Sequence, residues 1–369
     1  MAKSRLHELS EQGQSVWIDF VSRELIHTGG LARLMDEDAV VGVTSNPTIF
    51  QKAISHGSDY DDQIRECLDE SDDPKEIFWR LAETDVTDAC DVLRSVYDAG
   101  DGKDGYVSIE VDPNLAYEQQ AQYDEAMRLH AHVDRPNLFV KIPGTKPGLG
   151  AIEDAIAQGK SINITLIFSL ERYREVAEAY IRGLERLVAA GGDPSPVASV
   201  ASFFVSRVDT EADKRLDAIG GHDHLKGKLA VANAKLAYQD YKRIFAGERW
   251  DALAARGASK QRCLWASTST KNPAYSDVMY VEDLIGPATV NTMPEETIQA
   301  FQDHGNVAPT LEQGIDDAKR LFDDLAQAGI DYDDVTATLE REGVEKFAES
   351  FRELLDGIRA KRSQLAGVA

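Results

Sequence analysis

The 369-residue sequence has few cysteines and no long apolar run. Its three cysteines, Cys67, Cys90 and Cys263, lack metal-ligand spacing and are odd in number, which indicates free thiols in a reducing compartment. No apolar run approaches the roughly 18 residues of a membrane-spanning helix, and the N-terminus lacks the apolar segment of a signal peptide. We therefore expect a cytoplasmic protein without a membrane-spanning segment.

Basic residues are also scarce. The chain has 40 Lys and Arg against 64 Asp and Glu, a net charge of −24, and it contains no basic tail or run. This balance argues against nucleic acid and anionic membrane surfaces as partners. It leaves small phosphorylated ligands open, because a few local cations can hold one phosphate.

Short apolar runs alternate with longer amphipathic stretches along the chain. Helical patterns include residues 22–35, 170–190 and 224–246. Strands that alternate with helices predict βαβ units and a parallel sheet, and eight such units close into a (β/α)8 TIM barrel. The eight predicted strands are residues 15–20, 40–45, 106–111, 138–142, 161–168, 197–205, 262–266 and 288–292.

An open, doubly wound α/β sheet is the alternative, but it usually carries a glycine-rich turn after its first strand. The turn Phe20-Val-Ser-Arg has no such pattern, and no repeat or proline-rich linker divides the chain. We predict one barrel domain over residues 1–369, with extra helices at about 51–99 and a C-terminal extension at about 310–366 that breaks near Gly329. The additions could be a lid, a subunit contact or solvated helices, and we expect the last.

A lysine interrupts the fourth apolar run. Lys141 lies between Asn137 and Thr145 in N-L-F-V-K-I-P-G-T, where Pro-Gly marks a strand end. Lysine is rarely buried unless paired, and burial disfavours its charged form. A neutral amine facing a pocket can attack a ketone to form a Schiff base. The alternative is a lysine whose stem lies along the sheet while its ammonium reaches solvent.

Polar side chains occur in or just after seven of the eight predicted strands. A barrel builds its active site in this way, from the carboxyl ends of several strands. Buried polar groups are costly, which argues against a purely structural role for all of them. They are Asp19, Asn46, Glu110, Lys141, Asn163 with Thr165 on the same face, Ser202 with Arg207, and Ser269 with Lys271.

Six motifs between residues 16 and 272 resemble the transaldolase family in matching order. The resemblance implies a class I aldolase-type barrel that uses no metal or other cofactor. It also implies transfer of a three-carbon dihydroxyacetone unit from a ketose phosphate to an aldose phosphate. The motifs are W-I-D-F at Asp19, T-S-N-P-T at 44–48, S-I-E-V-D-P at 108–113, V-K-I-P at 140–143, N-I-T-L-I-F-S at 163–169 and S-F-F-V-S-R-V-D at 202–209.

Carried over residue by residue, the resemblance implies that Lys141 forms the Schiff base. Glu110 would act through a water as general acid and base, and Thr165 would help to hold that water. Asp19 would take and return the hydroxyl proton as the carbon–carbon bond breaks and forms. The implied substrate-binding residues are Asn46, Asn163 and Ser202 for the three-carbon unit, and Arg207, Ser269 and Lys271 for the phosphate.

Other interpretations of single residues stay open. Asp19 could be a paired carboxylate of the barrel core, and Asn46 could be only a turn residue. Asp112 follows Glu110 by two residues and could simply cap the turn at Pro113. Two features depart from the family pattern. The motif around Lys141 reads K-I-P-G-T, and Lys271 stands where the commonest transaldolases have arginine. Lysine lacks the two-pronged donor of arginine.

The resemblance therefore predicts a transferase of the pentose phosphate pathway. It would interconvert sedoheptulose 7-phosphate plus glyceraldehyde 3-phosphate with erythrose 4-phosphate plus fructose 6-phosphate. One alternative is a Schiff-base aldolase that releases dihydroxyacetone from fructose 6-phosphate. Another is a non-catalytic barrel that binds sugar phosphates as a regulator or scaffold. The sequence leaves both a monomer and a homodimer open.

Overall fold

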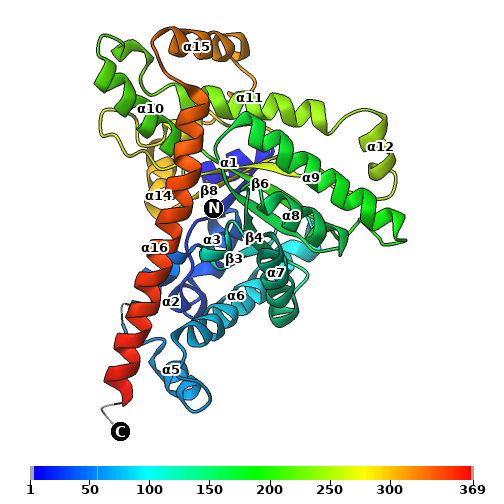
Figure 1. The fold of residues 1–369 in the computed structure, drawn as a ribbon, viewed down its shortest axis with the longest axis vertical. Coiled ribbons are helices and arrows are strands. Elements are labelled where there is room, and N and C mark those ends of the chain that lie inside the picture. The colour runs from blue at the N-terminus through cyan, green and yellow to red at the C-terminus, as the bar shows by residue number, and fades with distance from the viewer. Residues whose placement is uncertain (1–3, 56, 367–369) are drawn as a thin grey trace.

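The computed structural model describes residues 4–55 and 57–366, and its centre is a closed barrel of eight parallel strands (Figure 1). Each strand pairs with the next in chain order, and the last pairs with the first. The predicted (β/α)8 barrel is confirmed, and the open sheet is excluded. The strands are β1 (Gln14–Ile18), β2 (Val40–Val43), β3 (Tyr106–Glu110), β4 (Leu138–Pro143), β5 (Ile162–Ile167), β6 (Ser199–Phe204), β7 (Arg262–Ala266) and β8 (Thr289–Met293).

Helices separate the strands and surround the barrel. In the described part of the chain, every helix is too short or too polar to cross a bilayer. The helices are α1 (Arg5–Glu11), α2 (Arg23–His27), α3 (Gly30–Asp38), α4 (Pro47–Ser55), α5 (Asp61–Leu68), α6 (Pro74–Ala99), α7 (Gln119–Val133), α8 (Gly148–Ala157), α9 (Leu170–Ala189), α10 (Ser206–Ile219), α11 (Leu229–Ile244), α12 (Glu248–Ala254), α13 (Met279–Glu282), α14 (Glu295–His304), α15 (Ile315–Gln327) and α16 (Tyr332–Ala366), with 3-10 turns η1 (Pro113–Leu115) and η2 (Asp223–Leu225).

Some predicted boundaries are wrong at the strand and helix ends. Strand β1 stops at Ile18, so Asp19 follows the strand instead of lying within it, although its N–H still donates to the Met293 carbonyl at 2.8 Å. The helix predicted at residues 22–35 is two helices, because Gly29 adopts φ +76° and interrupts it. The predicted break near Gly329 is confirmed, since α15 ends before it and α16 begins after it.

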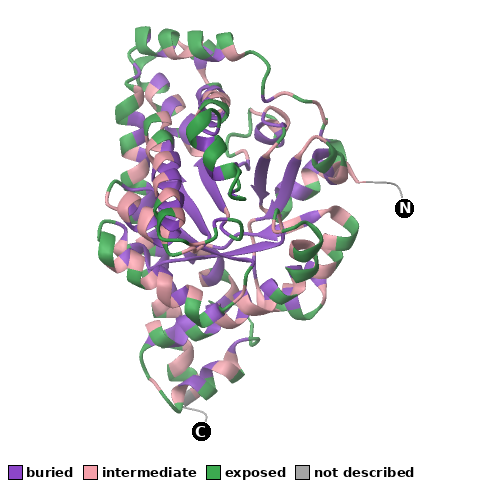
Figure 2. Cartoon of the chain, turned by 90° about the vertical axis from the view of Figure 1, so that its right-hand side faces the viewer, coloured by how far each residue is buried: buried purple, intermediate pink, exposed green. Residues whose placement is uncertain are grey.

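Large aromatic side chains fill the barrel below its carboxyl-terminal rim. Apart from the half-buried Val41 and Arg262, the strand residues are buried, and they form the purple centre of Figure 2. Trp17 and Phe139 come from strands that are not neighbours, yet their ring centroids lie 6.1 Å apart, so they meet across the interior. Tyr106 stacks on Phe139 at 4.1 Å. Because side chains alternate along a strand, the residues two positions further along, Asp19 among them, also face the interior.

The extra helices pack against one another and against the rim. Helix α16, drawn in red in Figure 1, crosses the barrel and contacts α4, α5 and α6. Thr48 donates a hydrogen bond to Ser350 at 2.8 Å, and Lys361 pairs with Asp61 at 2.7 Å. The expectation of merely solvated helices is wrong for α16. The single-domain prediction stays a prediction, and residues 1–3, 56 and 367–369 lie outside the described part.

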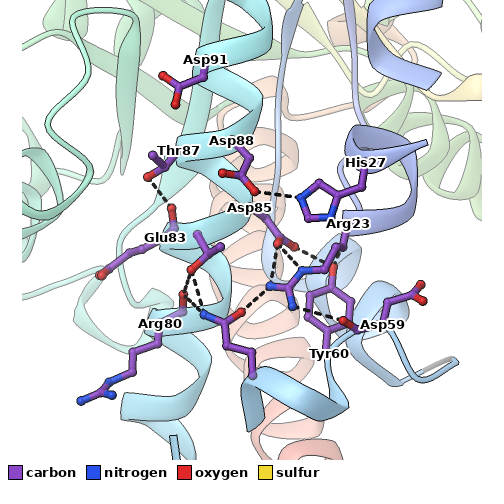
Figure 3. Close-up of polar contacts among 12 residues, drawn as sticks. Arg23, His27, Asp59, Tyr60, Arg80, Glu83, Asp85, Thr87, Asp88 and Asp91 are labelled. Carbon is purple, nitrogen blue, oxygen red and sulfur yellow. Dashed lines mark hydrogen bonds and ion pairs between the residues drawn. The ribbon is translucent and has the colours of Figure 1, made fainter. Parts of the chain in front are cut away.

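A buried ion pair ties the insert after β2 to helix α2 (Figure 3). Arg23 donates to Oδ1 of Asp85 on α6 at 3.0 Å from Nε and at 2.9 Å from Nη2. Tyr60 donates to Oδ2 of the same carboxylate at 2.7 Å. Burial raises the pKa of Asp85, and the Arg23 guanidinium opposes that shift. Both oxygens of this carboxylate therefore hold neighbouring segments together.

Replacement of Asp85 with alanine should destabilise the fold. The change leaves the Arg23 guanidinium and the Tyr60 hydroxyl without their acceptor, and breaking a buried pair typically costs about 3–5 kcal/mol. Asp88→Ala is the matched control on α6, because its partner His27 is exposed and such pairs contribute about 0–1 kcal/mol. Thermal midpoints would check the difference. Equal midpoints for the two variants would contradict a structural role for the Arg23–Asp85 pair.

Candidate active site

A cavity of about 620 Å³ opens at the carboxyl-terminal ends of the barrel strands. Two residues of the predicted site, Glu110 and Asn163, do not line it but contact residues that do, Lys141 and Ser202. The barrel thus gathers the predicted residues at one rim, while their roles stay predictions. The predicted residues that line the cavity are Asp19, Asn46, Lys141, Thr165, Ser202, Arg207, Ser269 and Lys271.

Lys141 and Glu110 lie side by side inside the barrel. The register of β3 and β4 places them opposite each other, and Nζ of Lys141 is 3.7 Å from Oε2 of Glu110. Nζ also donates to the Ser45 carbonyl oxygen at 2.9 Å. Lys141 is only 5% exposed, so its amine does not extend to bulk solvent past the strand end. The structure thereby excludes the alternative in which the ammonium simply reaches solvent.

Glu110 is a buried carboxyl with unused hydrogen-bonding capacity. Neither of its oxygens has a hydrogen-bond partner among the described residues. Burial raises the pKa of Glu110 to about 7, while Lys141 opposes the shift and Asp19 adds to it. A carboxyl with this pKa can donate and accept protons near neutral pH. On the same strand end, Asp112 accepts from the Asn114 N–H, which confirms the capping interpretation.

Asp19 faces the cavity from the loop after β1. The Thr44 hydroxyl donates to Oδ1 of Asp19 at 2.7 Å. Burial raises the pKa of Asp19, and both Lys141 and the Thr44 hydrogen bond oppose the shift. The hydrogen-bond partner of this carboxylate is thus a hydroxyl from the next strand end, not the cation expected of a paired core carboxylate.

Asn163 lies one layer behind the cavity. It is fully buried, accepts from the Ser202 hydroxyl at 2.7 Å and donates to Ser108 at 3.1 Å. Asn163 accepts from Ser202, which lines the cavity, and the predicted contact of Asn163 with substrate stays a prediction. Thr165 also lines the cavity, and its hydroxyl has no partner among the described residues.

Strand β5 carries a bulge beside Thr165. The register with β6 shifts between Ile164 and Ile167, and Leu166 adopts φ +58°. A bulge redirects side chains and is common beside active sites. The Asn46 Oδ1 accepts from the Ile49 N–H at the start of α4, which confirms its interpretation as a turn residue. Asn46 also lines the cavity, and its substrate-binding role stays a prediction.

Two cations reach the cavity from the loops after β6 and β7. Arg207 lies in the first turn of α10, which follows β6. Burial lowers the pKa of Arg207, and the carboxylates of Asp19 and Glu110 oppose this downward shift. Lys271 donates to the Ser269 hydroxyl at 2.6 Å. The N-terminus of α10 adds a positive end of a helix dipole. This side of the cavity is therefore suited to an anionic group.

Asp209 anchors the helix that carries Arg207. It accepts from the Ala230 N–H at 2.7 Å and from the Tyr280 hydroxyl at 2.9 Å. Burial raises the pKa of Asp209 to about 7. The sequence motif contained Asp209, but its role as an anchor depends on partners from α11 and α13 that no local pattern identified.

Sequence analysis missed several residues that line the cavity. Helix α16 contributes side chains to the wall although it lies at the far end of the chain. Its amphipathic pattern predicted a helix but gave no information about where the helix docks. The missed residues include Lys52 on α4, Glu296 on α14, and Leu339, Glu342, Lys346 and Phe347 on α16.

Comparison with known proteins finds similarity along nearly the whole chain. Residues 16–358 match the family described as Transaldolase/Fructose-6-phosphate aldolase. The chain is 56% identical to a transaldolase of Acidothermus cellulolyticus over 351 residues, which cover 95% of this chain and 94% of that protein. The chain is 54% identical to a transaldolase of Frankia alni, and the match covers 96% of both proteins. It is 52% identical to a transaldolase of Mycolicibacterium paratuberculosis, with 95% of both proteins covered. Coverage this complete includes the insert after β2 and most of α16.

Proposed function

The chain belongs to the transaldolase/fructose-6-phosphate aldolase family and is an enzyme with transaldolase function, and we propose that it works through a Schiff base on Lys141. The observation that carries this proposal is the buried Lys141 amine 3.7 Å from a buried carboxyl, beside a cavity that Asp19 also lines. Mere binding of a sugar phosphate requires no such arrangement.

The first half of the reaction forms the imine. The neutral amine of Lys141 attacks the ketone carbon of the donor sugar, and a carbinolamine results. Glu110 then supplies a proton through a water to the departing hydroxyl, which leaves as water. The pKa of Glu110, about 7, supports both this acid step and the base step needed later for hydrolysis. Thr165 would help to hold this water, a role supported by its place in the cavity lining and by a hydroxyl with no partner among the described residues.

The second half breaks and remakes a carbon–carbon bond. Asp19 removes the proton from the hydroxyl next to the bond, the aldose leaves, and the bonding electrons enter the iminium to give an enamine. The enamine attacks the acceptor aldehyde, and Asp19 returns the proton. Hydrolysis of the new imine then frees Lys141. Ser202 and Asn46 line the cavity where they can bind the three-carbon unit.

We propose that the substrates are the sugar phosphates of the pentose phosphate pathway. The interconversion is sedoheptulose 7-phosphate plus glyceraldehyde 3-phosphate with erythrose 4-phosphate plus fructose 6-phosphate. Arg207, Ser269 and Lys271 support binding of the phosphate at the cationic side of the cavity. The three free cysteines, all buried, support a cytoplasmic location because they fit a reducing compartment.

An assay of fructose 6-phosphate with and without erythrose 4-phosphate separates transfer from simple cleavage. We expect turnover that depends on the acceptor. Release of free dihydroxyacetone at the same rate without an acceptor would favour the aldolase activity that the family also includes.

Borohydride reduction in the presence of fructose 6-phosphate should trap the imine. Reduction converts the imine to a stable amine, so mass spectrometry should find one adduct on Lys141. Lys141→Ala should give no adduct and no activity. The Lys271→Ala variant, which removes another cavity lysine, should still be modified at saturating substrate. An adduct on a different lysine would overturn the proposed mechanism.

Glu110→Gln should slow both formation and hydrolysis of the imine, because the amide keeps the shape but cannot exchange the proton. General acid–base catalysis typically contributes about 10²- to 10⁴-fold in rate. Glu342→Gln is the control, since Glu342 is an exposed carboxylate that lines the cavity. A Glu110→Gln enzyme within about threefold of the parent would rule out a proton-transfer role.

Arg207→Ala and Lys271→Ala should raise KM for phosphorylated substrates. Loss of one hydrogen bond to a charged group costs about 1.5–3 kcal/mol, on the order of ten- to a hundredfold in affinity. Activity with unphosphorylated sugars should change far less. Lys214→Ala, an exposed lysine on α10, is the control. Equal losses with both kinds of sugar would show that the replaced residue does not act on the phosphate.

A further inference from the structure

The guanidinium of Arg207 lies near two aromatic rings from distant parts of the chain. Its central carbon is 5.2 Å from the ring centroid of Phe204 at the end of β6 and 5.8 Å from that of Phe347 on α16. Both rings are buried, with 7% and 4% of their surface exposed. Stacking against aromatic faces is a favourable environment for a guanidinium that has lost part of its hydration.

The side chain of Arg207 needs such support to keep its direction. Arginine has several rotatable bonds, and holding it in one rotamer costs conformational entropy. The nearby carboxylates Asp19 and Glu110 attract it, which would draw the charge toward the reacting centre. Two rings at the guanidinium limit the positions it can take while leaving its N–H donors available to the cavity.

Helix α16 is fixed on the rim, so Phe347 has a defined position. Asp334 near its start pairs with Arg215 of α10 at 2.6 Å, and Glu340 pairs with Arg172 of α9 at 3.3 Å. Beyond Phe347, Ser350 accepts from Thr48 of α4 at 2.8 Å. These contacts lie on both sides of Phe347 along the helix.

Gly343, one turn before Phe347, lies against the barrel. A Cβ atom at this position would lie 3.0 Å from the Leu166 side chain in the bulge of β5. The glycine thus lets the helix lie directly against the rim, one turn from the ring that lines the cavity.

We infer that Phe347 is a positioning residue for substrate phosphate, which it affects by orienting the Arg207 guanidinium. The inference rests on the proposed phosphate role of Arg207 and deepens it. It also gives the C-terminal extension a function in substrate affinity: the last helix supplies one of the two rings near the phosphate-binding arginine.

Steady-state kinetics of Phe347→Leu with fructose 6-phosphate test this inference. Leucine keeps an apolar side chain but removes the ring, so KM should rise about three- to tenfold with kcat changed less than about twofold. Phe347→Tyr restores a ring and should return KM to within about twofold of the parent. The thermal midpoint of each variant shows whether it is folded.

Phe351→Leu is the matched control. Phe351 lies one turn further along α16, is equally buried, and packs against Phe78 at 5.3 Å instead of Arg207. Loss of this ring should leave KM within about twofold of the parent. Equal rises of KM in the two variants would overturn the inference, because they would reflect loosening of the helix as a whole.

A double-mutant cycle completes the test. In the Arg207→Ala background, Phe347→Leu should raise KM by less than about twofold, since the group it orients is gone. The full effect of Phe347→Leu in that background would overturn the inference while leaving the phosphate role of Arg207 intact. If Arg207→Ala alone leaves KM unchanged, the proposed phosphate site and this inference fail together.

Discussion

Placing a lysine and a glutamate side by side inside a barrel costs free energy, because both side chains lose their hydration. The pair Lys141–Glu110 persists because the surroundings compensate in part. The Ser45 carbonyl accepts from the amine, and the amine itself opposes the upward shift in the Glu110 pKa. The Glu110 carboxyl, with a pKa of about 7, can exchange a proton near neutral pH. The pair therefore places an amine beside a proton-exchanging group, as the proposed chemistry needs.

The barrel core packs beneath the Lys141–Glu110 pair, and the cavity opens above Lys141. Trp17, Tyr106 and Phe139 fill the interior beneath it, so the cavity has a floor. Gly42 makes room for this packing, since a Cβ atom there would lie 2.5 Å from the Trp17 ring. Above the pair, loops after the strands supply hydroxyls and cations. Strand alternation connects the two levels, because Asp19 follows Trp17, and Lys141 follows Phe139, by two positions on the same face.

The insert after β2 and the C-terminal helix form part of the enzyme's working structure. The Arg23–Asp85 pair holds α6 against α2, and α16 lies across α4 and α6 to reach the cavity. Shared coverage with transaldolases of other species indicates that these additions belong to this branch of the family. In this chain the ring of Phe347 lines one side of the site from a helix that follows the complete barrel.

The sequence by itself determined the barrel, its eight strands and most of the residues at its rim. It could do so because strand periodicity is local, and parallel strands in a closed barrel bring all carboxyl ends to one side. Only the tertiary structure decided that Asn163 lies behind Ser202 and that Asp19 follows its strand. It alone placed Phe347 beside Arg207. Such placements depend on packing between segments far apart in the chain, and a helix's amphipathic pattern fixes which face is buried but not the surface it is buried against.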